Sequence, residues 1–225
     1  VLAGRVSTNG EGPELDLGGT MSEIPVSLVK RYWPPQMAGA ARRWFAENVD
    51  AGIIPQGSIR LKFKAAQVIA RTLPADFAEV RFEFERGRLT YFSELPPVTE
   101  ATGSVRMTGT SFELALTSGR IGGASLDDGV LELTKDEAGL WSAILEFVAS
   151  GEAAEALAIL NFPPLGYADR LGISLQQLGG LAAARARFRF PVRGGLTPAD
   201  LEFGAAANLR GIALPDAFGG FDLTE

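Results

Sequence analysis

Several stretches of this chain alternate an apolar residue with a charged one, and this pattern constrains the fold more than any other feature. The clearest runs are residues 59–64, 80–85 and 184–190. Side chains of a β-strand point to opposite faces with a period of two residues, so each run produces one apolar face and one charged face. A sheet built from such strands either closes over a core or leaves its apolar face open to another molecule.

The composition favours a globular protein without the usual catalytic residues. The chain has 225 residues, 46% of them hydrophobic, which is enough to bury a sizeable core. It contains neither histidine nor cysteine, which excludes histidine bases, cysteine nucleophiles, disulfides and the common zinc and haem ligand sets. The net charge of −6 argues against a nucleic-acid partner. We therefore expect no enzyme activity, no catalytic residues, no metal site and no cofactor.

The periodicity predicts a mainly β fold, a curved and mostly antiparallel sheet of groove or half-barrel shape. Short connections between the strands leave no room for parallel crossovers. Residues 1–225 are expected to form a single β-rich segment, with two short helical insertions near 25–49 and 151–178. Strands are predicted at residues 1–8, 14–21, 57–68, 78–85, 88–92, 103–108, 111–117, 120–133, 140–148, 180–192 and 199–213.

Glycine, proline and aspartate mark the expected breaks between these elements. Helical spacing of apolar residues predicts helices at 25–33, 36–49 and 152–160, with Ser150 as the N-cap of the last. Ser174 and Gln177 have the spacing of a capping box for one more helical turn. Turns are predicted at residues 9–12, 86–87, 109–110, 118–119, 127–129 and 137–139.

The apolar strand positions are the main candidate site, because they line either a closed core or an open groove. A groove for acyl chains needs only a continuous apolar surface, which gains roughly 25 cal/mol per Å² covered. The candidate lipid-binding residues are Leu61, Phe63, Phe82, Phe84, Met107, Leu114, Leu116, Phe188 and Phe190. Phe112, Leu131 and Leu133 belong to the same pattern.

Two further groups of residues admit a binding role beside a structural one. Four aromatic residues and one methionine of the first insertion either mark a lipid headgroup boundary or pack on the sheet; they are Tyr32, Trp33, Met37, Trp44 and Phe45. An arginine ladder on one strand either meets phosphate headgroups or pairs with Glu83 and Glu85 or with Glu202; it consists of Arg185, Arg187 and Arg189.

Asp127, Asp128 and Gly129 suggest either a calcium ligand set or a hairpin turn. The other oxygen ligands of a calcium loop are missing from the surrounding sequence, so we predict the turn.

The order of several short motifs resembles a known family. Residues 29–35 and 41–44 precede the strand at 57–61, and residues 89–97 precede the strand at 103–107. Residues 156–165 complete the series. Together, over roughly residues 20 to 215, they resemble the AsmA-like superfamily of envelope proteins, YhdP-type branch, in the region of unknown function before the AsmA-like C-terminal part.

This resemblance implies a non-enzymatic segment of a periplasmic protein of Gram-negative bacteria, anchored in the inner membrane. It implies a role in phospholipid transport and outer-membrane biogenesis, with phospholipid acyl chains as partners on an apolar β-groove. The chain opens on a strand-like sequence without an initiator methionine, so we expect a piece of a longer protein whose membrane anchor lies outside it. The alternative is a structural or interaction β module that has a closed core and binds no lipid.

Overall fold

The computed structural model is mainly β. It describes residues 2–9, 12–33, 39–70, 77–90, 96–161, 166, 169, 174, 178–193, 200–217 and 221–224. The strands are β1 (Leu2–Asn9), β2 (Gly12–Pro25), β3 (Val49–Lys64), β4 (Ala78–Leu89), β5 (Val98–Thr108), β6 (Ser111–Ile121), β7 (Ala124–Lys135), β8 (Trp141–Glu152), β9 (Gly179–Pro191), β10 (Glu202–Ala217) and β11 (Phe221–Thr224). The helices are α1 (Val26–Tyr32), α2 (Gly39–Asn48), α3 (Ala65–Ala70) and α4 (Ala153–Asn161).

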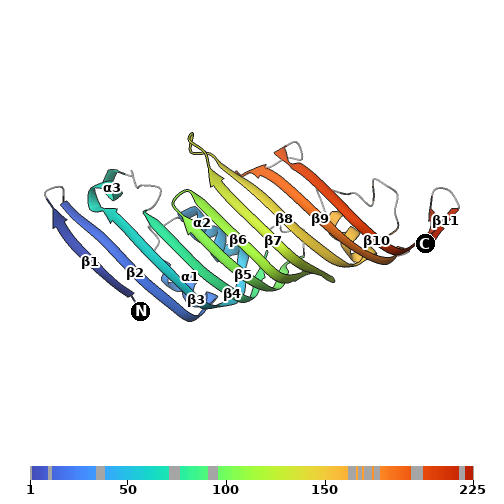
Figure 1. Ribbon diagram of the computed structural model, residues 1–225, viewed down its shortest axis with the longest axis horizontal. Helices are drawn as coiled ribbons and strands as arrows, with labels where there is room; N and C mark the ends of the chain where they lie inside the picture. The colour runs from blue at the N-terminus through green and yellow to red at the C-terminus, as the bar shows by residue number, and fades with distance from the viewer. Residues whose placement is uncertain are drawn as a thin grey trace.

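All eleven strands form one open sheet in sequence order, from β1 at one edge to β11 at the other (Figure 1). Each strand pairs with the next in antiparallel register. This arrangement confirms the predicted mainly β, antiparallel fold. Because every connection joins neighbouring strands, the contacts between strands are made without any crossover.

Tight turns connect the central strands where polar residues supply the hydrogen bonds. Between β5 and β6, the Thr108 Oγ1 accepts hydrogen bonds from the backbone N–H of Thr110 at 3.3 Å and of Ser111 at 3.1 Å. Between β7 and β8, the Asp136 carboxylate accepts one from the Leu140 N–H at 2.8 Å. The turns predicted at 109–110 and 137–139 are therefore confirmed. Residues 10 and 11 of the first predicted turn lie outside the described residues.

Three predicted hairpin turns are wrong, because the chain continues straight through them. Residues 86–87 lie within β4, 118–119 within β6 and 127–129 within β7. Arg86 has φ 53° and Asp128 φ 52°, and the strand register shifts beside each of them. These positions are β-bulges, which share the left-handed backbone conformation with turns but do not reverse the chain. The actual turn between β6 and β7 lies at Gly122–Gly123.

The bulges keep apolar residues on one face of the sheet although the sequence alternation changes phase. In β5, Glu100 also has a positive φ of 52°, and the register with β6 shifts beside it. Each bulge adds one residue, so the positions beyond it return to the apolar side. In β7, for example, Leu126 lies beyond the bulge and still packs in one cluster with Leu116 of β6.

The larger helices pack against the sheet near one end of the strands, and α1, α2 and α4 appear behind it in Figure 1. Val26 of α1 is buried, and α1 contacts β2 and β3. Helix α4 contacts β8 and β9. Small side chains allow α4 to pack closely on the sheet: Ala153 and Ala156 on the helix, and Ala149 and Ala182 on the strands.

Several predicted boundaries also change. The strand predicted at 57–68 begins earlier, at Val49, and ends at Lys64, where α3 starts. The strand predicted at 88–92 is the end of β4, and residues 91–95 lie outside the described part of the chain. Ser150 belongs to β8 instead of capping α4, and its hydroxyl donates to the Asp127 carboxylate at 3.2 Å. Of the capping box predicted at 174–177, only Ser174 is described.

Candidate functional site: the open apolar face

One continuous row of side chains crosses the sheet on its apolar face. Residues opposite each other in an antiparallel pair project to the same side, so the strand register identifies the members of the row. From β2 to β10, the partners in order are Met21, Gly57, Phe82, Val105, Leu114, Leu131, Leu145, Phe188 and Phe203. We call this face, with the neighbouring rows on the same side, the apolar face.

The structure places every candidate lipid-binding residue on the apolar face. A second row, parallel to the first, runs from β3 to β9 through Ile59, Val80, Met107, Phe112, Leu133, Ala143 and Phe190. At one end of the strands, Leu61 lies opposite Leu17, and Phe63 lies opposite Leu15. Toward the other end, Phe84 and Leu116 flank Gly103.

Most large side chains of the apolar face remain partly open to solvent. Phe63, Phe82, Leu114, Leu131 and Phe190 are all of intermediate exposure. Among the described residues, no large side chain is fully buried. A second layer packed on this face would bury such residues as completely as an ordinary core does. The apolar face is therefore covered only in part.

The covered part lies at the helical end of the sheet. One buried cluster contains Val98, Ala101, Ile121, Ala124, Leu126, Ala149 and Ile159. Ile159 belongs to α4, and the other members belong to β5, β6, β7 and β8. A second cluster joins Ala153 and Ala156 of α4 to Ala182 of β9. Small residues thus predominate where helix packs on sheet, while phenylalanine, leucine and methionine occupy the open part.

Three phenylalanines on the apolar face pack against one another in series. The rings of Phe147 and Phe188 lie 6.2 Å apart, and those of Phe188 and Phe203 lie 4.7 Å apart. The sequence pattern identified Phe188 alone. The pattern does not identify Phe147, because the apolar residues Ile144 and Val148 lie on the opposite face of β8 and interrupt the alternation. Phe203 lies in an alanine- and glycine-rich strand, where only its position opposite Phe188 reveals its role.

The opposite face of the sheet, the charged face, carries ion pairs both between strands and within β4. Arg60 lies 3.8 Å from the Asp16 carboxylate, and Lys62 lies 3.9 Å from that of Glu14. Arg81 and Arg106 both contact Glu79. The hydrogen bond from Arg81 lowers the pKa of the Glu79 carboxyl below its ordinary value, and the positive charges of both arginines act in the same direction. Many acidic and basic side chains of the charged face therefore form exposed ion pairs.

The arginine ladder of β9 pairs differently from the prediction. Arg187 forms an ion pair with Glu146 of β8 at 2.9 Å. Glu83 and Glu85 belong to β4, which β5 to β8 separate from β9, so the predicted pairing with them is wrong. Glu202 lies opposite Arg189 in the register, but the described residues show no ion pair between them.

The aromatic residues of the first insertion do not form one surface. Trp33 and Phe45 pack together with ring centroids 5.7 Å apart, and the Arg42 Nε donates a hydrogen bond to the Trp33 carbonyl at 3.1 Å. Tyr32 and Trp44 are exposed by 68% and 42%, respectively. Met37 lies outside the described residues. Part of the group thus joins α1 to α2, and part of it faces solvent.

Metal-binding groups, membrane-spanning helices and hollows are the other features that bear on a functional site. The described residues contain no group of three acidic or other metal-binding side chains that could hold a metal ion. No helix in this part of the chain is long and apolar enough to cross a membrane. An open hollow of about 700 Å³ over β2 to β6 is lined mainly by charged-face residues, such as Thr20, Ser58, Arg81, Arg106 and Glu113. Four members of the first row, Met21, Gly57, Phe82 and Val105, also line this hollow.

Comparison with protein-family models, with curated proteins and with solved structures gives no match for this chain.

Proposed function

We propose that this chain is a non-enzymatic segment of a periplasmic protein with a role in phospholipid transport and outer-membrane biogenesis, held to the inner membrane by a segment outside this chain. The apolar face is proposed to hold phospholipid acyl chains. The observation that carries the proposal is the unbroken row of partners from Met21 to Phe203, because its large side chains remain half exposed. An apolar surface of this breadth on a protein surface marks a binding site.

The shape of the apolar face suits acyl chains better than a compact ligand. Acyl chains gain free energy from any continuous apolar surface, at roughly 25 cal/mol per Å² covered, and require no fixed polar partner. The two parallel rows offer such a surface without interruption by a charged side chain. The resemblance to AsmA-like envelope proteins supports the same function. The competing function is an interaction module whose apolar face is covered by another protein surface.

Adjacent residues of β6 provide a matched test, because Leu114 projects from the apolar face and Glu113 from the charged face. A photo-crosslinking residue, p-benzoylphenylalanine, is introduced at either position, and the protein is expressed in the periplasm of a Gram-negative host. We expect phospholipid adducts by mass spectrometry after irradiation at position 114 and none at position 113. Protein adducts without lipid at position 114 would favour the interaction module, and equal labelling at both positions would contradict a site on the apolar face.

A further inference from the structure

Strand β9 places three arginines in a line on the charged face. Arg185, Arg187 and Arg189 alternate with Ala184, Ala186 and Phe188, and each is exposed. Residues two apart in a strand are separated by about 6.7 Å, so the three side chains form a stripe of evenly spaced guanidinium groups. We propose that this arginine stripe, with the adjoining surface of β10, binds a phosphoryl group.

The stripe has fewer acidic partners than Arg60, Arg81 and Arg106, which lie on the charged face of other strands. Its flanking positions in the register are Val148, Glu146 and Ile144 on β8, and Ala206, Gly204 and Glu202 on β10. Two of these are acidic, and only Glu146 forms an ion pair, with Arg187. Among the described residues, neither Arg185 nor Arg189 has one. By contrast, Arg60, Arg81 and Arg106 each lie within 4.0 Å of an acidic side chain.

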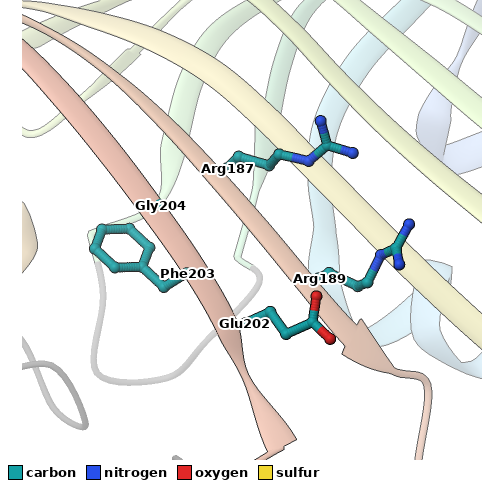
Figure 2. Close-up of a pocket in the computed structure, with 5 residues that line it drawn as sticks. All are labelled: Arg187, Arg189, Glu202, Phe203 and Gly204. Carbon is teal, nitrogen blue, oxygen red and sulfur yellow. The ribbon is translucent and has the colours of Figure 1, made fainter.

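The surface beside the stripe has room for a ligand. An open hollow of about 370 Å³ is lined by Arg187, Arg189, Glu202, Phe203 and Gly204 (Figure 2). A Cβ atom built on Gly204 would meet nothing within 4 Å. In Figure 2, the side chains of Arg187 and Arg189 extend from β9 in the same direction, away from Gly204, and the side chain of Glu202 on β10 extends toward Arg189. Arg187 and Arg189 therefore both line a shallow, open site on the charged face.

Phosphoryl groups match this arrangement chemically. A guanidinium group donates two parallel hydrogen bonds to a phosphate, and such charge-assisted bonds are about twice as strong as neutral ones. A long polyanion would be repelled by the net charge of −6. A small ligand interacts mainly with the charges of the nearby arginines, because charges beyond about 10 Å are screened at 0.1 M salt. The inferred ligand thus carries one or two phosphoryl groups, either as a soluble metabolite or in a lipid headgroup.

The test compares two variants that remove exposed arginines from the charged face. In the double variant, Arg185→Gln and Arg189→Gln remove the guanidinium groups that lack an ion pair, while Arg187 stays bound to Glu146. The control, Arg60→Gln, removes an arginine that is already paired with Asp16. Pyrophosphate and citrate are titrated into each protein by calorimetry, and retention on phosphatidylglycerol vesicles is measured by co-sedimentation. Unfolding curves check that both variants remain folded.

We expect the unmodified chain and the Arg60→Gln control either to bind pyrophosphate more strongly than citrate or to be retained on the vesicles. The double variant should lose at least about tenfold in affinity. Binding of pyrophosphate would identify a soluble source, and retention on vesicles alone a headgroup. Failure to bind either probe, equal binding of citrate, or an unchanged affinity of the double variant would overturn the proposal. Crosslinking to lipid at position 114 does not depend on these outcomes, because Leu114 projects from the opposite face.

Discussion

Phe84 of β4 occupies the space directly above Gly103 of β5. Its Cζ atom lies 2.8 Å from the point that a Cβ on Gly103 would take. Gly57 stands in the same relation to Phe82, whose Cβ lies 2.7 Å from the corresponding point. The two glycines thus allow both phenylalanines of β4 to pack closely on the neighbouring strands. This packing shapes the apolar face at the centre of the sheet.

Substitution of Gly103 by alanine is expected to destabilise the protein. The new Cβ would collide with Phe84 and with the backbone carbonyl of Ala115, which cannot move without disturbing the β5–β6 pairing. Overpacking of this kind costs about 1–3 kcal/mol. Urea unfolding measures the change, and Gly204→Ala is the matched control because its Cβ would meet nothing within 4 Å. Equal losses in the two variants would contradict the close packing at Gly103.

Truncation of the apolar face should cost less free energy where the face is open than where α4 covers it. Ile121→Ala removes a side chain that is 3% exposed, within the cluster under α4, and should cost about 2–5 kcal/mol. Leu114→Ala removes a half-exposed side chain and should cost about 1 kcal/mol. The free energies of unfolding of the two variants make the comparison. A loss at Leu114 as large as that at Ile121 would mean that the face is closed.

The bulge at Asp128 should tolerate glycine but not a β-branched residue. Its φ of 52° lies in the left-handed region, which aspartate enters at modest cost and glycine freely. Asp128→Val is expected to destabilise the protein by about 1–3 kcal/mol, while Asp128→Gly should change its stability by less than about 1 kcal/mol. Thermal unfolding provides the measurement. If valine were accepted as readily as glycine, the backbone at this position would have to be extended.

Protonation of Glu79 should reduce stability at acidic pH. The pKa of its carboxyl is lower in the folded protein than the ordinary value of 4.5, so the folded state binds protons less readily than the unfolded state. The stabilisation is therefore present above pH 4.5 and disappears as the pH falls through the lowered pKa. Because the pair with Arg81 is exposed, the effect should be small.

Glu79→Gln should therefore flatten the acid side of a plot of melting temperature against pH. Glu83→Gln is the control, since the described residues show no ion pair at Glu83 and it belongs to the same strand. An acid side equally steep in the Glu79 variant and the unmodified chain would rule out this contribution.

The alternating pattern was sufficient to predict which side chains share a face. All the apolar positions selected from it, from Leu61 to Phe190, project from the same side of the sheet. The prediction succeeds because the period of two belongs to the extended backbone itself. It misses Phe147, because β8 carries apolar residues on both faces, and Phe203, because β10 is rich in alanine and glycine.

The mistaken turns have a common physical cause. Glycine and aspartate beside Arg86 and Asp128 indicate a left-handed backbone conformation, and the structure has that conformation at both residues. Whether the chain then reverses or continues depends on the neighbouring strands, which hydrogen-bond on both sides of each bulge. The local sequence therefore predicts the backbone conformation of the residue, but not whether the chain reverses there.

By itself, the sequence determined that the chain forms antiparallel strands with one apolar and one charged face, because alternation and short connections are local properties. Only the tertiary structure decided how much of the apolar face is covered. Coverage depends on where α4 packs, and Ile159 reaches strands far from it in the chain. Ion-pair partners were decided in the same way: strand order, not sequence distance, brings Arg187 to Glu146 instead of Glu83. Both outcomes follow from contacts between distant residues, which local periodicity does not encode.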